Sequence, residues 1–205
     1  MSDIFKDAAA MTGAITDWSP SEMINLNNFT ELTDCFRFIT MATAYARAAT
    51  ILYKSELVES IEQQKRNNTP VLNIDSVLIP FAFLCRQVTE LSIKAGILRY
   101  DSSCDLKRIG HSLERAWNHF CAIQSDDEAY KEVCAKYNVD TIRKIDRYDS
   151  RGTAFRYPQS FDDTNTDFID SKELYLYTLD FCCTFDEISR PAMRGQADDS
   201  AQNEG

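Results

Sequence analysis

The sequence predicts an all-α protein, an up-and-down bundle of four to five main helices with one long loop before the last helix. Apolar residues recur at spacings of three and four along most of the chain, as they do on the buried face of a helix. No run shows the alternation that is typical of a β-strand. Capping residues and prolines also stand where the periodic segments begin and end.

The composition fits one globular domain. The 205 residues are 44% hydrophobic, which is enough for one sizeable core. We expect an N-terminal extension over 1–29, the helical bundle over 30–191 and a disordered acidic tail over 192–205. The formal net charge of -10 argues against general binding to a nucleic-acid backbone, although a local basic site remains compatible with it.

Seven cysteines, an odd number, lie mostly at apolar positions of the expected helices. This predicts reduced core thiols in a cytoplasmic protein rather than a disulfide framework. A thiol enzyme with Cys85 or Cys121 as nucleophile is disfavoured, because buried thiols stay protonated. The chain has no CxxC pair and only two histidines, so we expect no metal site and no cofactor. It also lacks a leader or a long apolar run, so no membrane association is expected.

The first periodic segment predicts one long helix, or two nearly collinear ones, over 30–66. Thr30 or Asn28 is the expected cap, and Pro70 follows the expected end. The residues expected on its buried face are Leu32, Phe36, Ile39, Thr43, Ala46, Thr50, Tyr53 and Leu57.

Residues 80–120 are expected to organise the molecule as two helices joined by a short polar connection. Asp75 or Ser76 can cap the first helix, with Pro80 near its first turn. Either Asp105 caps the second helix, or residues 107–110 form a loop and the helix begins near His111, which is the start that we favour. Two such helices would pack antiparallel and bring both histidines to a common end. Their expected apolar stripes are Phe81, Leu84, Val88, Leu91, Ala95 and Leu98, and then Ile109, Leu113, Ala116, Phe120 and Ile123.

Shorter elements complete the chain. Ser125 and Glu128 form a capping box for the next helix, and a short helical piece is expected over 141–147. Residues 147–170 form the long loop, and loops of that length tend to be functional or disordered. The last helix is expected to begin at Asp170 or Ser171 and to bury Leu174, Thr178, Phe181, Phe185 and Ile188.

Pairs of arginine and histidine are the candidate catalytic groups. Arg115 and His119 are four residues apart and share a helix face, and Arg108 and His111 stand at the entrance of that helix. An imidazole can take a proton from a ribose 2'-hydroxyl while a guanidinium holds the phosphate, which suits metal-independent RNA cleavage. The alternative is structural: His111 caps the helix and His119 packs against its neighbours.

A second basic group surrounds the start of the long loop. It could form an RNA-binding patch with Arg108, in which Tyr148 and Tyr157 stack on bases. Alternatively, these residues pair with helix carboxylates and hold the loop in place, a role that the aromatic neighbours of Arg156 favour. The residues are Arg143, Lys144, Arg147, Arg151 and Arg156.

Two stretches resemble a known family. LCRQVTELSIKAGIL at 84–98, followed by KRIGHSLERAW at 107–117, is similar to the central helices of the HEPN superfamily, and YDSRGTAFRYP at 148–158 resembles the loop that follows in some members. The resemblance covers roughly half of the chain. It implies a helical bundle, usually a homodimer, in prokaryotic toxin–antitoxin, antiphage-defence or RNA-processing systems. Many members are metal-independent endoribonucleases, and others only bind RNA or nucleotides.

The arginine–histidine gaps in this chain are shorter than in the ribonuclease motif of that family. Glu90 and Lys94 match polar positions on the family's second helix and His111 matches the histidine that opens the third, which implies structural polar roles first. We therefore expect a HEPN-like dimeric module that binds RNA, a nucleotide or a partner protein encoded in the same operon. An active endoribonuclease and a purely structural interaction protein are the alternatives.

Overall fold

The computed structural model describes residues 33–59, 62, 66, 74–148 and 170–189. Over these residues every regular element is helical, which confirms the all-α prediction and is compatible with an up-and-down bundle. The expected extension over 1–29 and the tail over 192–205 lie outside the described residues, as do residues 149–169 of the expected loop. None of the described helices combines the length and the apolar character needed to cross a membrane.

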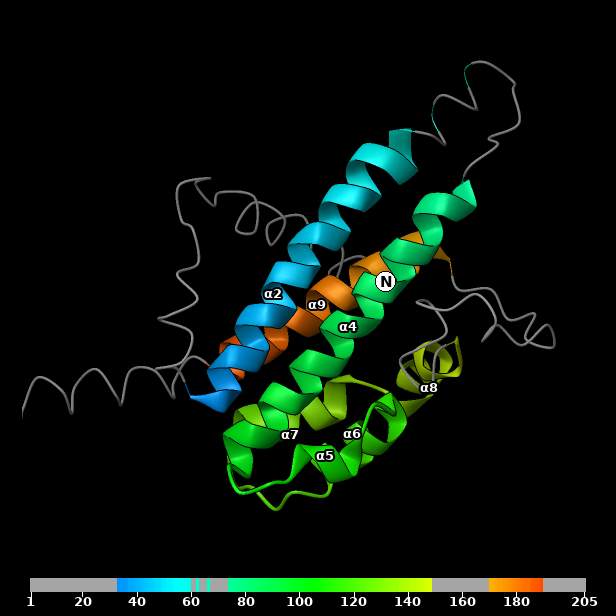
Figure 1. Cartoon of the computed structure of the whole chain (residues 1–205). Coiled ribbons are helices and arrows are strands. Elements are labelled where there is room, and N and C mark those ends of the chain that lie inside the picture. The colour runs from blue at the N-terminus through cyan, green and yellow to red at the C-terminus, as the bar shows by residue number, and fades with distance from the viewer. Residues whose placement is uncertain (1–32, 60–61, 63–65, 67–73, 149–169, 190–205) are drawn as a thin grey trace, which may run out of the picture.

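The three long helices α2 (Asp34–Ile51), α4 (Ile74–Tyr100) and α9 (Ser171–Ser189) form the body of the molecule, and each packs against the other two. Figure 1 shows them side by side, with the short helices gathered at the lower end. Among the short helices, α6 (Leu113–Cys121) packs against α4 and α8 (Val139–Tyr148), and α7 (Glu128–Lys136) packs against α9. The remaining elements of the described residues are the π-helix η2 (Leu52–Val58) and α5 (Leu106–Ile109).

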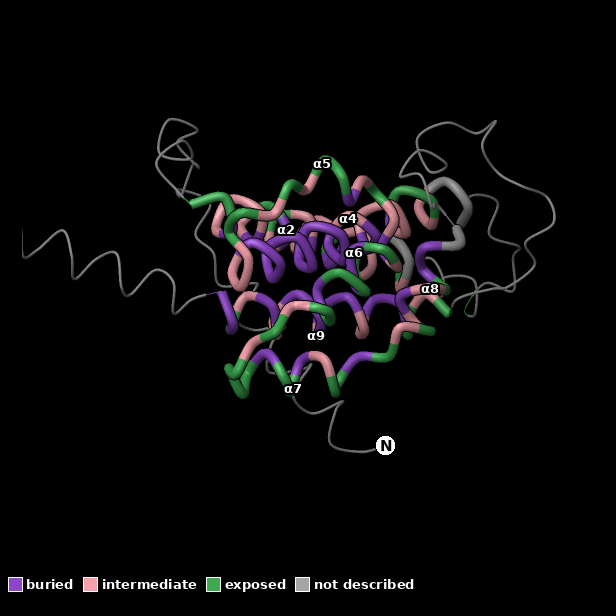
Figure 2. Tube along the Cα trace, turned by 90° about the horizontal axis from the view of Figure 1, so that it is seen from below, coloured by how far each residue is buried: buried purple, intermediate pink, exposed green. Residues whose placement is uncertain are grey.

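Helix α4 is the centre of the fold. All residues over 88–98 are buried, because α2, α9 and α6 cover different sides of the helix. Figure 2 shows the buried residues concentrated where these helices meet. Gly96 lies in this stretch, and a Cβ there would meet the ring of Phe185 and stand 2.9 Å from Cε2 of Phe120. The absence of a side chain therefore lets α6 and α9 approach α4 closely.

The first long helix differs from the prediction in its start and its buried face. It begins at Asp34 rather than near Thr30, and its last part continues as the π-helix η2 instead of an α-helix. Phe36, Thr43 and Tyr53 are only half-buried, and Leu32 and the side chain of Leu57 lie outside the described residues. The small residues Cys35 and Ala42, which directly precede Phe36 and Thr43, are buried instead. Small buried side chains let α2 approach its neighbours closely. The buried residues of α2 are Cys35, Ile39, Ala42, Ala46, Ala49 and Thr50.

Three further helix starts differ from expectation. Helix α4 begins at Ile74, so Pro80 lies inside it and not in the first turn. Both alternatives for the connection hold in part, because Asp105 caps the short α5 while α6 starts later with Ser112 as its cap. Helix α7 is capped by Asp127, whose side chain accepts from the backbone N–H of Ala129. The expected capping box at Ser125 is therefore wrong.

The stripes of the later helices are largely as expected. All five apolar positions expected in α9 are buried, and Asp170 caps it by accepting from the N–H groups of Lys172 and Glu173. Of the two central stripes, only Leu84 and Ile123 are half-buried and the other members are buried. The large apolar side chains of these segments mark the core face correctly.

Candidate functional site

A network of charged side chains lies inside the bundle where α4, α6 and α8 meet. The fully buried Arg86 donates from Nη1 to Oε2 of Glu90 at 2.8 Å and from Nη2 to the carbonyl oxygen of His111 at 2.5 Å. Its Nη2 also lies 3.6 Å from Oδ1 of Asp146. Lys94 Nζ donates to the second oxygen of Glu90, Oε1, at 2.7 Å. Two positive and two negative side chains thus balance within the core.

The spacing of the sequence explains how one helix supplies most of this network. Arg86, Glu90 and Lys94 follow one another at intervals of four, so they lie on one face of α4. A buried charge costs several kcal/mol unless it is paired and hydrogen-bonded. The network therefore favours the one placement of α6 and α8 on α4 that satisfies these groups.

Asp146 connects the network to the start of α6. Its Oδ2 accepts from the hydroxyl of Ser112 at 2.9 Å and from the N–H of Glu114 at 3.2 Å, while its Oδ1 accepts from the N–H of Leu113 at 2.9 Å. These N–H groups belong to the first turn of a helix and have no partner within it. The Asp146 side chain on α8 thus supplies the hydrogen-bond acceptors that the first turn of α6 lacks.

His111 is the most exposed member of the site, with 59% of its side chain accessible. Its Nδ1 lies 2.9 Å from Oε1 of Glu90. Burial on its own would raise the pKa of Glu90, but the hydrogen bond and charge of Lys94, the charge of Arg86 and the hydrogen bond of His111 together lower it. An ionised carboxylate only accepts, so His111 carries a proton on Nδ1. The Nε2 of the neutral ring is then its proton acceptor.

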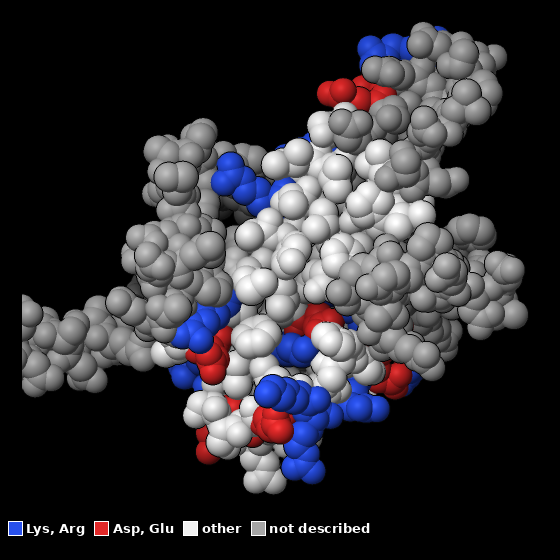
Figure 3. Space-filling view, viewed as in Figure 1, with Lys and Arg blue, Asp and Glu red and all other residues white. Residues whose placement is uncertain are grey.

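Basic side chains of α5 stand next to this histidine in the chain. Lys107 and Arg108 are both exposed, and Figure 3 shows basic side chains, with acidic ones among them, at the end of the molecule where α5 lies. Gly110, which separates this helix from His111, has a φ of 73° and so reverses the chain there. Arg108 is three residues from the exposed imidazole in the sequence, and the site that pairs the two side chains stays a prediction.

The other predicted basic residues fall in several settings. Arg143 donates from Nε and Nη2 to Oε1 of Glu114 at 3.0 and 2.7 Å and from Nη1 to Oδ1 of Asp140 at 2.6 Å. It is paired with helix carboxylates, as the structural alternative holds. Lys144 on the same helix is exposed. Arg147 lies in α8 without a described side chain, and Arg151 and Arg156 lie outside the described residues.

The two histidines lie at opposite ends of α6, so the expectation that they share a common end is wrong. His111 precedes the helix and contacts α4 through Glu90, whereas His119 lies in the last turn. Arg115 and His119 are both exposed on α6, so His119 is not the packing residue of the structural alternative. The physical reason for the separation is that α6 begins only after His111 and spans the residues between them.

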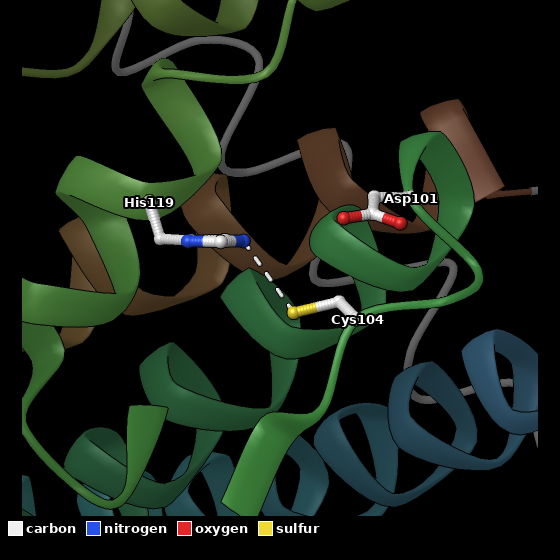
Figure 4. Close-up of side chains that lie close together, drawn as sticks. All are labelled: Asp101, Cys104 and His119. Carbon is white, nitrogen blue, oxygen red and sulfur yellow. Dashed lines mark hydrogen bonds between the residues drawn. The ribbon is translucent and has the colours of Figure 1, made fainter. Parts of the chain in front are cut away.

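A second polar group surrounds His119. Its Nε2 lies 3.4 Å from Sγ of Cys104, and Asp101 is the third member (Figure 4). Burial raises the pKa of the Cys104 thiol, and the carboxylates of Asp101 and Asp105 add to this effect. Sequence reasoning missed this group because its members come from a turn and from a later helix.

The two cysteines considered as nucleophiles remain poor candidates. Burial raises the pKa of Cys85 to about 12. Cys121 is expected near the core, but the residue is exposed. Partial burial of its thiol and the neighbouring Cys134 still raise the pKa of Cys121 to about 12. Neither thiol ionises near neutral pH, which is what a nucleophile requires.

Over the described residues, fold and site define a helical bundle built around a buried ion network, and this network orients the exposed imidazole of His111. Such an imidazole can bind an anion when protonated or accept a proton when neutral. Comparison of the chain with protein-family models, with curated proteins and with solved structures gives no match.

Proposed function

We propose that the chain is a HEPN-like helical module that binds a phosphate-containing ligand, RNA or a nucleotide, at the surface around His111. The observation that carries the proposal is the contact between Nδ1 of His111 and the ionised, buried Glu90. It fixes an exposed imidazole in one orientation, and preorganised groups bind a ligand at a lower entropic cost. The capping role that the structural alternative gives to His111 is wrong, because Ser112 caps α6.

The charges around His111 favour an anionic ligand. The positive and negative side chains of the buried network cancel, so protonation of His111 adds one positive charge at the surface. Lys107 and Arg108 on α5 add two more. A guanidinium and an imidazolium donate charge-assisted hydrogen bonds, which suit phosphate oxygens.

A homodimer in a cytoplasmic defence or toxin–antitoxin system is part of this proposal, and its main support is the HEPN resemblance. One structural feature is consistent with a dimer. Figure 3 shows that the face on which α2 and α4 lie is largely uncharged, and the chain exposes Met41, Ile51 and Ile79 on these two helices. An uncharged face with exposed apolar side chains is typical of an interaction surface.

Fluorescence anisotropy with a labelled single-stranded RNA, in EDTA and at low salt, tests the binding function. We expect His111→Ala and Arg108→Gln each to weaken binding by about tenfold, because each removes a charge-assisted hydrogen bond. Lys131→Gln is the matched control, since Lys131 is an exposed lysine on α7 that pairs with Glu128. No binding by the wild type would favour the purely structural protein, and equal losses in all three variants would contradict a site at His111.

An active metal-independent endoribonuclease is the second candidate. It is favoured by the protonated Nδ1 of His111, because Nε2 can then accept the 2'-hydroxyl proton while Arg108 holds the phosphate. His119 with Arg115 is the other candidate pair. Incubation of the protein with structured RNA in EDTA separates the two functions. If the wild type cleaves the RNA, and His111→Ala or His119→Ala abolishes cleavage without unfolding the protein, the chain is an enzyme and not only a binding module. If the RNA is bound but stays intact, the enzyme is excluded.

A further inference from the structure

Asp101, Cys104 and His119 form a group of potential metal ligands at the C-terminal end of α4. Each offers one ligand atom, a carboxylate oxygen, a thiol sulfur or an imidazole nitrogen, and these atoms all lie within 4.8 Å of one another. Figure 4 shows the three side chains directed toward one shared space. Over the described part of the chain this is the one cluster of three such residues.

We propose that Asp101, Cys104 and His119 bind a transition-metal ion of the Zn²⁺ class. Tetrahedral Zn²⁺ with a Zn–S bond of about 2.3 Å and a Zn–N bond of about 2.0 Å places its sulfur and nitrogen ligands about 3.5 Å apart. The Sγ–Nε2 separation of 3.4 Å between Cys104 and His119 already fits. The carboxylate oxygen of Asp101 lies within 4.8 Å of both atoms and has only to approach the ion, while a water molecule takes the fourth position.

The local structure explains why these atoms converge. Cys104 donates its N–H to the carbonyl of Asp101 at 3.2 Å, which closes a turn directly after α4. Ser103 donates from its hydroxyl and its N–H to Oδ1 of Asp101, at 2.7 and 3.2 Å. Such outer hydrogen bonds orient a ligating carboxylate, and Oδ2 remains for the ion. His119 completes the group because α6 packs on α4.

The ligand types select the class of metal. Ca²⁺ and Mg²⁺ prefer sites made of oxygen atoms alone, whereas one sulfur, one nitrogen and one oxygen suit Zn²⁺ or the chemically similar Co²⁺. Three protein ligands with one open position are typical of catalytic rather than structural zinc sites. The site does not include His111 or Glu90, so it stands independently of the proposed ligand-binding surface.

Titration of the reduced, untagged full chain with Co²⁺ tests the proposal. We expect one equivalent of Co²⁺ to give a thiolate-to-metal charge-transfer band and the visible bands of a tetrahedral ion, and Zn²⁺ to displace both. Cys104→Ser should abolish the charge-transfer band, and Asp101→Asn and His119→Ala should each weaken binding by at least about tenfold. Zn²⁺ should also raise the melting temperature of the wild type but not that of Cys104→Ser.

Cys121→Ser is the matched control, because Cys121 is an exposed free cysteine at the end of the same helix as His119, and its side chain interacts with Cys134 and not with the proposed ligands. It should keep the cobalt spectrum and the affinity of the wild type. Absence of the charge-transfer band in the wild type, or its loss in Cys121→Ser instead of Cys104→Ser, would overturn the proposal. Circular dichroism establishes that each variant is folded, and RNA binding by the wild type is measured separately, so failure of one proposal does not imply failure of the other.

Discussion

The carboxylate of Asp146 on α8 accepts a 2.9 Å hydrogen bond from the backbone N–H of Leu113, the first residue of α6. Ser112 caps the same helix from its usual position, by accepting from the N–H of Arg115 at 3.2 Å. The start of α6 is therefore held both by its own preceding residue and by a side chain 33 residues further along. Because Arg86 also contacts Asp146, the cap couples α4, α6 and α8.

Asp146→Ala should destabilise the protein far more than the loss of an ordinary helix cap. Loss of a cap costs about 1 kcal/mol, whereas removing one partner of a buried ion pair costs about 3–5 kcal/mol, and Asp146 serves in both roles. Urea unfolding followed by far-ultraviolet circular dichroism measures the difference. Asp170→Ala is the control, since Asp170 is exposed and caps only α9. Equal losses in the two variants would show that the contact with Arg86 contributes nothing.

Stability should fall on acidification because of Glu90. Its folded-state pKa is lowered from 4.5, so the unfolded chain binds a proton at a higher pH than the folded protein does. The stabilisation is complete above about pH 4.5 and is lost as the pH falls through the folded-state pKa. Free energies of unfolding measured across this range should show a weaker pH dependence in Glu90→Gln.

Lys94→Met provides the second arm of that experiment, because the hydrogen bond and charge of Lys94 are the strongest interactions that lower the pKa of Glu90. It should also flatten the pH dependence, while Lys131→Met, which removes an exposed lysine from α7, should not. A wild-type profile retained in both Glu90→Gln and Lys94→Met would mean that other carboxylates cause the acid sensitivity.

How much of the fold follows from the sequence depends on the size of the buried side chains. The stripe of α9 is built from residues such as Phe181 and Phe185, and its periodicity predicts the core face correctly. The core face of α2 includes Cys35, Ala42 and Ala49, which a search for large apolar residues overlooks. Small residues become core positions only when a neighbouring helix comes close, and that is a property of the tertiary packing.

The candidate site shows the same limit. Glu90 and Lys94 are expected as structural polar residues because of the HEPN resemblance, and their spacing of four places them on one helix face. Asp146 could not be recognised from the sequence, since its partnership with Leu113 depends on how α8 packs beside α6. Local spacing carries no information on such contacts, and the meeting of Cys104 and His119 was missed for the same reason.

The buried cysteines should be protected from thiol-specific reagents in the native protein. Cys85 and Cys182 are buried, and burial raises the pKa of each to about 12, so in the native protein neither should react with a thiol-specific reagent. Mass spectrometry after a short treatment should find both unmodified, and all seven cysteines should react after denaturation. Rapid native labelling of Cys85 would indicate that α4 opens locally.

Gly96→Ala should destabilise the bundle although alanine favours helix. The substitution gains about 1 kcal/mol of helix propensity, but its Cβ would meet the ring of Phe185 and lie 2.9 Å from Phe120. Overpacking of a core costs about 1–3 kcal/mol, and α6 and α9 must both shift, so we expect a net loss of about 1 kcal/mol in urea unfolding.

A double-mutant cycle identifies the contact responsible. Gly96→Ala combined with Phe185→Leu should be more stable than the sum of the two single changes predicts, by more than about 0.5 kcal/mol, because the smaller side chain gives the new methyl group room. Gly110→Ala is the control: it is strained by a φ of 73° but has no atom within 4 Å of its new Cβ, so its effect should add to that of Phe185→Leu. Additive behaviour at both glycines would mean that close packing on α9 is not why position 96 lacks a side chain.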